Sequence, residues 1–316
     1  MTSPPYWALR DYGTKGQLGL EPDFREYISK LLNIFDELKR VLKRTGSFYL
    51  NLGDTYSRGR SISAKCMLGI PWRVALALID RAWILRNAIA WHRPNAMPSS
   101  VKDRLSNTYE HIFHFVKSKE YYYNLDAIRV PHKFVARPFN IRVRDAQKGR
   151  LKSKWGVLAH ASQEEVNAYD EKHYTKYPPH EPRHFQLLSM GIGHGGHTGK
   201  TVRHDHPLGK NPGDLWKVNS KQHPFAHFAV YPEEICVRPI LSSCPEQVCM
   251  KCGAPQFPMR YVDCGCKEGF RSGIVLDMFA GSGTTLVVAK KLGRDFVGIE
   301  LNREYVKIAN RRLASV

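Results

Sequence analysis

Two short strings at opposite ends of the chain contain the residue types that could do chemistry. The first is Thr-Ser-Pro-Pro-Tyr at residues 2–6. Its two prolines fix consecutive backbone φ angles, so the Ser3 hydroxyl, the Pro4 carbonyl and the Tyr6 ring keep set directions. A rigid wall that combines polar groups with an aromatic ring suits an exocyclic amine. Taken alone, the same string would also be typical of a polyproline-like surface turn.

The second string, residues 277–285, is a glycine turn between an apolar strand and a helix. Gly281 and Gly283 let the backbone approach a ligand, and a threonine can cap the helix that follows. Glu300 lies 19 residues beyond Gly281, where its carboxylate could accept both hydroxyls of a ribose. The turn lacks the third glycine of a dinucleotide fingerprint, so NAD or FAD is less favoured than another nucleotide-like cofactor. The alternative is a tight structural turn followed by a solvated acid.

Strands that alternate with helices must position both strings. Apolar residues at three- and four-residue spacing predict helices, and β-rich runs bounded by turn residues predict strands. Because the two kinds of element alternate, we expect an α/β fold with a mostly parallel sheet and helices on both faces. The predicted helices cover residues 24–42, 71–81, 284–292 and 303–313, and the predicted strands cover residues 47–52, 84–91, 111–116, 274–278 and 296–299.

The charge balance predicts a polyanionic partner. The chain of 316 residues has 48 Lys and Arg against 29 Asp and Glu, a formal charge of +19, and is 42% hydrophobic. Residues 133–222 are the most basic part, with little periodic hydrophobicity, which is typical of a loop-rich insertion. No apolar run approaches the roughly 20 residues that span a membrane, and no signal segment opens the chain. We therefore expect a cytoplasmic protein with no membrane partner.

Four of the seven cysteines form two close pairs near the carboxyl-terminal string. Four thiolates suit a tetrahedral zinc ion, so we expect a small zinc knuckle over residues 244–268. Cys244 is an alternative ligand, because Cys-x-Cys is a less common second half than Cys-x-x-Cys. Free or redox-active thiols are the other interpretation. The predicted metal ligands are Cys249, Cys252, Cys264 and Cys266.

The two strings and the later acid together resemble the amino-group DNA methyltransferases that use S-adenosylmethionine, in the order that places the catalytic motif before the cofactor motif. Residues 2–6 resemble the catalytic motif in its serine form, which is associated with N4-cytosine methylation, whereas adenine-N6 enzymes usually carry Asp or Asn there. Residues 211–216 and 227–233 resemble the segment that completes the methionine side of the cofactor pocket. The resemblance implies a Rossmann-like methyltransferase fold.

It also implies a division into a catalytic half at residues 1–132, a target-recognition insertion at residues 133–222 and a cofactor-binding half at residues 223–316. The implied substrate is double-stranded DNA, from which a cytosine is flipped out to stack on Tyr6. A cognate restriction endonuclease and a second copy of the chain are further candidate partners. The implied catalytic residues are Ser3, Pro4, Pro5 and Tyr6. The implied cofactor-binding residues are Asp277, Phe279, Ala280, Gly281, Ser282, Gly283, Thr284, Thr285, Glu300, Leu301 and Phe228.

One departure from the family pattern leaves alternatives open. Members of the family normally carry a strand immediately before the Ser-Pro-Pro-Tyr motif, and Met1 leaves no room for that strand. Its loss would expose the apolar edges of two neighbouring strands, so a catalytically impaired DNA-binding protein is one alternative. Independently of this departure, the serine of the motif leaves open a methyltransferase that acts on adenine N6, or on an RNA or protein amide.

Overall fold

The computed structural model describes residues 1–59, 61–131, 206–220, 231–256 and 264–316. The chain divides into two compact units, one of residues 1–130 with 211–316 and the other of residues 131–210. Most of the predicted insertion lies outside the described residues. The first unit resumes at residue 211, whereas the insertion was predicted to end at residue 222. The fold and the site described below belong to the first unit.

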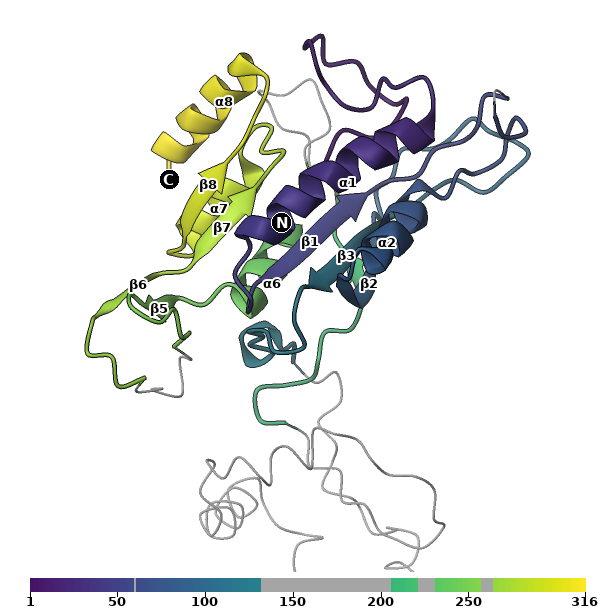
Figure 1. Ribbon diagram of the computed structural model, residues 1–316. Coiled ribbons are helices and arrows are strands. Elements are labelled where there is room, and N and C mark those ends of the chain that lie inside the picture. Colours follow the sequence, from purple (N-terminus) through teal and green to yellow (C-terminus); the bar gives the residue numbers. More distant parts are fainter. Residues whose placement is uncertain (60, 132–205, 221–230, 257–263) are drawn as a thin grey trace, which may run out of the picture. The chain divides into compact units, whose positions relative to one another are not determined.

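Three strands from the amino-terminal half of this unit and one strand that follows residue 211 form a four-stranded sheet with the order β1-β3-β2-β4 (Figure 1). The long helix before it begins at an N-cap, where the Asp23 side chain accepts from the N–H of Arg25. The second helix begins with Pro71 in its first turn, as the sequence predicted. The elements are α1 (Phe24–Val41), β1 (Ser47–Leu52), α2 (Ile70–Asp80), β2 (Ile84–His92), β3 (Tyr109–Val116), the 3-10 helix η1 (Asp126–Ile128) and β4 (Leu215–Lys217).

The expectation of a mostly parallel sheet is wrong for these four strands. β3 lies between β1 and β2 and pairs antiparallel with both, and the one parallel pair is β2 with β4. A parallel crossover requires a connection of a dozen or more residues, usually a helix. Residues 93–108, which connect β2 to β3, contain no helix, so the chain returns directly alongside β2 in the opposite direction.

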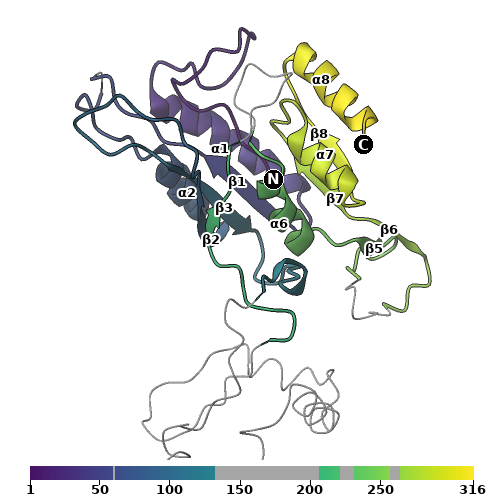
Figure 2. The same cartoon turned by 180° about the vertical axis from the view of Figure 1, so that it is seen from behind.

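The carboxyl-terminal half contains a parallel pair of strands around the glycine turn and a small antiparallel hairpin before it (Figure 2). The parallel pair is β7 with β8, and the hairpin is β5 with β6. The strands and helices predicted around the turn are present. The elements are α6 (Glu234–Ser243), β5 (Gln247–Cys249), β6 (Phe270–Ser272), β7 (Ile274–Asp277), α7 (Thr284–Lys291), β8 (Asp295–Gly298) and α8 (Arg303–Ala314).

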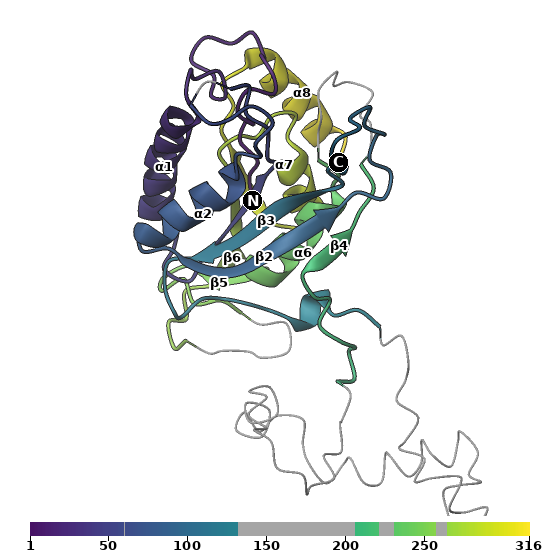
Figure 3. The ribbon, with the colours of Figure 1, turned by 90° about the vertical axis from the view of Figure 1, so that its right-hand side faces the viewer.

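Helices cover both faces of the sheet, as predicted (Figure 3). Side chains alternate along β1, so Phe48 and Leu50 join one apolar cluster with α1 and α2. Tyr49, between them in sequence, joins the other cluster with residues of α6 and α7. None of the described helices is long and apolar enough to cross a membrane.

The first two residues of the chain lie between β1 and β7. Thr2 pairs in parallel with Leu50, because its N–H donates to Tyr49 O and its carbonyl accepts from Asn51 N, both at 3.0 Å. On the other side, the amino group of Met1 lies 3.4 Å from Leu276 O. Residues 1 and 2 therefore supply a short backbone bridge at the position where the family resemblance implies a strand.

Candidate active site

The amino-terminal string, residues 2–6, and the glycine turn, residues 277–285, meet at a buried hydrogen bond. Thr2 Oγ1 donates to Asp277 Oδ1 at 2.5 Å, and both residues are at most 1% exposed. The same carboxylate accepts from the N–H of Phe279 at 3.1 Å and from the Tyr231 hydroxyl at 3.0 Å. Burial, and secondly Asp277, raise the pKa of Tyr231, so its hydroxyl stays protonated and donates. Asp277 thereby ties three distant segments of the chain together.

The string is also anchored by one residue of α1, Tyr27, and by one residue just before this helix, Glu21. The Tyr27 hydroxyl donates to Pro5 O at 2.7 Å, and the Trp7 indole N–H donates to Glu21 O at 2.9 Å. Burial raises the pKa of Tyr27 far above its usual range, which keeps this donor in its protonated form. The prolines restrict the string, and these contacts fix its direction.

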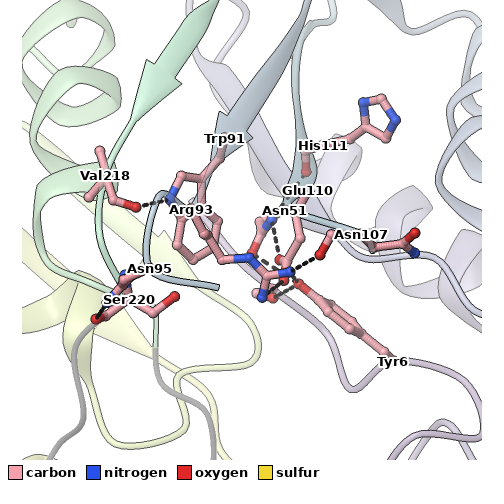
Figure 4. A network of polar contacts seen from close by, with 11 residues as sticks. Tyr6, Asn51, Trp91, Arg93, Asn95, Asn107, Glu110, His111, Val218 and Ser220 are labelled. Atoms are coloured by element: carbon pink, nitrogen blue, oxygen red, sulfur yellow. Dashed lines mark hydrogen bonds and ion pairs between the residues drawn. The ribbon is translucent and has the colours of Figure 1, made fainter. Parts of the chain in front are cut away.

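The Tyr6 ring packs against a glycine and its hydroxyl end is held by polar side chains from β1 and β3. A Cβ on Gly53 would lie 2.6 Å from a Tyr6 ring carbon, so only glycine leaves room for the ring. The Tyr6 hydroxyl donates to Glu110 Oε2 at 2.6 Å and lies 3.1 Å from Asn51 Oδ1 (Figure 4). Burial, and secondly the Glu110 charge, raise the pKa of Tyr6 well above its ordinary value. Our sequence analysis missed Glu110, although a lone acid in the apolar strand Tyr109–Val116 is a visible signal.

Glu300, the acid predicted to bind a ribose, lies beside Gly281, the first glycine of the turn. Gly281 has a φ of +52°, and its N–H donates to Glu300 Oε2 at 2.7 Å. The other carboxylate oxygen accepts from Asn302 N at 2.8 Å. Nothing lies within 4 Å of the position that a Cβ of Gly281 would take, so the turn is open there. At Gly283 a Cβ would lie 2.9 Å from Ala309 Cβ, so this second glycine permits close packing of α8.

Several of the predicted cofactor-binding side chains are instead engaged within the protein. Ser282 and Thr284 are buried, and Arg312 Nη1 donates to both hydroxyl oxygens, at 2.9 and 3.0 Å. Burial lowers the pKa of Arg312. Thr285 is fully buried and hydrogen-bonds the Tyr231 hydroxyl. These three side chains stabilise the turn. A ligand could therefore contact the backbone of these three residues.

The remaining predicted cofactor residues differ in exposure. Ala280 is buried and its N–H donates to Ile299 O at 2.9 Å. Phe279 is partly buried against the α1 side of the core, in the same cluster as Tyr6. Leu301 is 58% exposed, beside Glu300. Phe228 lies outside the described residues.

The loop after the string reaches the segment beyond Glu300. Asn302 Nδ2 donates to Thr14 Oγ1 at 3.2 Å, and the rings of Tyr12 and Tyr305 meet edge to face at 6.4 Å. Burial raises the pKa of Tyr12, and the nearby Glu300 charge raises it further. The loop after the string therefore borders the predicted ribose site.

The four predicted metal ligands lie together beside the β5–β6 hairpin. Their sulfur atoms are all within 4.8 Å of one another. A zinc tetrahedron with Zn–S bonds of about 2.3 Å separates its sulfurs by about 3.8 Å, so the cluster has a suitable size and donor set. Cys244, the alternative ligand, is buried and stands outside this group. The ligands that gather are Cys249, Cys252, Cys264 and Cys266.

Comparison with known proteins decides the family. Residues 1–311 match a family model described as DNA methylase. The chain belongs to this DNA methylase family. The match covers both the string and the glycine turn, so the resemblance to S-adenosylmethionine-dependent amino-group methyltransferases is confirmed.

Two bacterial members of the family are similar along nearly the whole chain. The Type II methyltransferase M.SfiI of Streptomyces fimbriatus is 31% identical over 97% of this chain and 84% of its own length. The Type II methyltransferase M.SmaI of Serratia marcescens is 30% identical over 99% of this chain and 82% of its own length. These methylases support a DNA-modifying enzyme of the restriction-modification type.

The fold of this methylase also occurs in a solved structure. The PvuII DNA methyltransferase, described as cytosine-N4-specific, matches with a TM-score of 0.55 over 99% of this chain and 77% of its own. Its sequence is 18% identical, so this likeness concerns the fold alone. It is consistent with the α/β architecture described above.

Proposed function

We propose that this methylase transfers a methyl group from S-adenosylmethionine to the N4 amino group of a cytosine in double-stranded DNA. The observation that carries the proposal is the Thr2–Asp277 hydrogen bond, which joins the residue before Ser3 to the last residue of β7, the strand that leads into the glycine turn. A base held by the string and a cofactor held by the glycine turn would thus share one site. Such positioning converts a slow bimolecular reaction into an effectively unimolecular one.

The residues around the glycine turn fit the nucleoside part of the cofactor. The open side of Gly281 leaves room for a close approach to the backbone. Glu300 accepts two N–H groups, and a carboxylate has about four lone-pair sites, so two remain for the hydroxyls of a ribose. The exposed Leu301 and the partly buried Phe279 offer apolar surface near the turn. When bound, the cofactor supplies an electrophilic methyl group on a sulfonium sulfur.

The string fits the target amine. The lone pair of a cytosine amino group is delocalised into the ring, so the site must draw the nitrogen toward tetrahedral geometry. Hydrogen bonds accepted by the Ser3 hydroxyl and the Pro4 carbonyl would do this, and the Tyr6 ring would stack on the base. Serine at position 3, in place of the Asp or Asn usual in adenine-N6 enzymes, supports the cytosine assignment.

Duplex DNA fits the charge of the chain. A net charge of +19 attracts the phosphate backbone, and that attraction weakens as salt is raised. A base inside a duplex is too far from such a string, so the cytosine must be flipped out, which costs a few kcal/mol. The insertion at residues 133–222 would select the sequence. As the modification half of a restriction-modification pair, the enzyme would protect host DNA from a cognate endonuclease, as a monomer or a homodimer.

The cysteine cluster would hold a structural zinc ion. Cys249 and Cys252 lie at the β5 end of the segment and Cys264 and Cys266 precede β6, so a tetrahedral ion would join its two ends. Methyl transfer requires no metal, so the ion would stabilise the excursion between α6 and β7. The proposed ligands are the four clustered cysteines Cys249, Cys252, Cys264 and Cys266.

A transfer assay tests the proposed function. Duplex DNA is incubated with the protein and S-adenosylmethionine, digested to nucleosides and examined by mass spectrometry. We expect N4-methylcytosine. N6-methyladenine as the sole product would favour the adenine alternative, and salt-sensitive DNA binding without any methylated nucleoside would favour the impaired binding protein.

Native mass spectrometry tests the zinc site separately. We expect one zinc ion per chain, lost in a Cys252→Ser variant together with part of the thermal stability. Cys66→Ser is the matched control, because Cys66 is an exposed thiol outside the cluster. A protein that carries no zinc after expression in zinc-supplemented medium would contradict the assignment.

A further inference from the structure

A directed chain of hydroxyl groups leads from Ser3 into the protein. Ser3 Oγ donates to the Tyr6 hydroxyl oxygen at 3.4 Å, and the Tyr6 hydroxyl donates to Glu110 Oε2 at 2.6 Å. The shorter contact belongs to the tyrosine hydrogen, since each hydroxyl has one hydrogen to give. Figure 4 shows the hydroxyl end of Tyr6 directed at Asn51 and Glu110.

Glu110 ends this chain as a pure acceptor. Its side chain is 13% exposed, and its other oxygen, Oε1, lies 3.0 Å from Arg93 Nη1. The Arg93 guanidinium, which is always charged, lies over the Trp91 ring at 5.9 Å. Asn51 Nδ2 donates to Glu110 Oε2 at 3.2 Å. An ionised carboxylate surrounded by donors has no hydrogen to offer, so Tyr6 has to donate to it.

The direction of this chain of hydrogen bonds determines whether Ser3 presents a donor or an acceptor to the target amine. Because the Tyr6 hydrogen is committed to Glu110, the Tyr6 oxygen is free to accept, and Ser3 gives its hydrogen inward. The outward side of Ser3 Oγ then carries only lone pairs. A reversed chain would turn the Ser3 hydrogen outward, toward the amine.

We propose that Glu110 is a positioning residue that sets the direction of this chain, so that Ser3 Oγ presents an acceptor to the target amine. The proposal rests on the proposed function. A serine hydroxyl can donate or accept, whereas the Asp of related motifs can only accept when ionised. Glu110 removes that ambiguity through Tyr6. An acceptor draws on an N–H of the amine and strengthens its nitrogen lone pair, whereas a donor at the same place would engage that lone pair.

The first test is Glu110→Gln. The amide has the same shape and can donate from its NH₂ group, which permits the reversed chain. We expect kcat to fall by about 10- to 100-fold, less than for a preorganised hydrogen bond removed outright, while the KM values for DNA and cofactor change less than about threefold. Glu120→Gln is the matched control, because Glu120 is exposed and pairs with Arg44 at the surface. Its kinetics should equal those of the wild type.

The second test separates an effect through Tyr6 from general damage. Tyr6→Phe keeps the ring and removes the hydroxyl, so Glu110 loses its route to Ser3. We expect Tyr6→Phe to lower kcat by a similar factor, and Glu110→Gln to change kcat less than about twofold in that background, because residues that act as a unit are not additive. If Glu110→Gln does not fold, Glu110→Ala, which also removes the acceptor for Tyr6, completes the same cycle, with a smaller loss in the Tyr6→Phe background than in the wild type.

The outcomes distinguish this role from the proposed function. A wild-type kcat in Glu110→Gln, or independent, multiplicative losses in the double variant, would overturn the role of Glu110 while leaving the methyltransferase intact. A wild-type protein that transfers no methyl group to DNA would refute the proposed function and the role with it. A selective loss of kcat that vanishes in the Tyr6→Phe background supports the proposal.

Discussion

The amino-terminal string, residues 2–6, and the glycine turn, residues 277–285, are held in place by partners at different distances along the chain. Tyr6 depends on Asn51 and on Glu110, the latter 104 residues away in sequence. Within the turn, Gly281 and Ser282 depend on Glu300 and Arg312, which lie 19 and 30 residues away. Asp277, at the start of the turn, instead depends on the distant residues Thr2 and Tyr231. The glycine part of the turn is therefore held largely by nearby residues, whereas the hydroxyl end of Tyr6 gains its partners only when β1 and β3 have paired.

The largest effect on the string side should come from Ser3→Ala. The change removes the acceptor proposed for the amine, and we expect kcat to fall by about 100-fold or more, as for the loss of one preorganised catalytic hydrogen bond. DNA binding, measured by fluorescence anisotropy at fixed salt, should change little. An alanine variant that methylates at the wild-type rate would show that the string does not touch the amine.

In the glycine turn, alanine substitutions at Gly281 and at Gly283 should have different effects. Gly283→Ala forces an L residue to a φ of +81° and brings its Cβ to 2.9 Å from Ala309, so we expect a loss of roughly 2–4 kcal/mol in unfolding free energy. Gly281→Ala has open space around its Cβ, so it should cost only about 1–2 kcal/mol of backbone strain.

Gly281→Ala should instead weaken cofactor binding, because its new methyl group occupies the space through which a ligand approaches. Urea unfolding and calorimetric titration with S-adenosylmethionine measure the two quantities. Equal losses of stability and of affinity in both variants would remove the distinction between an open glycine and a packed one.

Thr2 joins the two regions, so its removal should weaken both. Thr2→Val keeps the shape but deprives the buried Asp277 carboxylate of a donor, and we expect unfolding to become easier by about 1–3 kcal/mol. Cofactor affinity and kcat should fall together. Thr45→Val, at an exposed position, is the control. A Thr2→Val variant that loses only cofactor affinity, or only kcat, would show that the string and the turn are not coupled through this contact.

The smallest expected effect concerns pH on the string side. His114 of β3 is 2% exposed, and its pKa is lowered to about 3, chiefly by burial and further by Arg86. The unfolded chain, with an ordinary value of about 6.5, binds the proton more readily between these values, so stability falls as the pH is lowered from about 6.5 toward 3.

The dependence on His114 can be isolated by comparing two proteins. We expect the wild type to lose up to about 1.4 kcal/mol more per pH unit than His114→Gln between pH 6 and pH 5. Urea unfolding at both pH values measures the difference. Identical pH dependences would mean that His114 takes up a proton without unfolding the sheet.

The same contrast explains what the sequence could predict. The four predicted helices, the five predicted strands and the glycine turn with Glu300 rest on local spacing, and they were predicted nearly to their ends. Helix α6 and the short strands β4, β5 and β6 were not predicted. The antiparallel placement of β3 was not, because the pattern of a strand does not state which neighbour it pairs with. The cysteine cluster was predicted from spacing alone, and the four sulfurs do gather.

The missed residues are those whose partners are distant. Glu110 looks like an ordinary polar position until β3 brings it to Tyr6, and Tyr231 acquires its role only beside Asp277. Ser282 and Thr284 were predicted as cofactor-binding residues, and the hydrogen bonds that their hydroxyls accept from Arg312 of α8 were not predicted. Long-range geometry of this kind follows from packing, which a single sequence does not display.

Sequencing of modified DNA tests the central claim most directly. Plasmid DNA from cells that express the wild-type chain, or its Ser3→Ala variant, would be read by a method that distinguishes N4-methylcytosine from N6-methyladenine. We predict N4-methylcytosine within one recurring target sequence for the wild type and its near absence for the variant. Methylated adenine alone, or wild-type DNA with no modified base, would contradict the account.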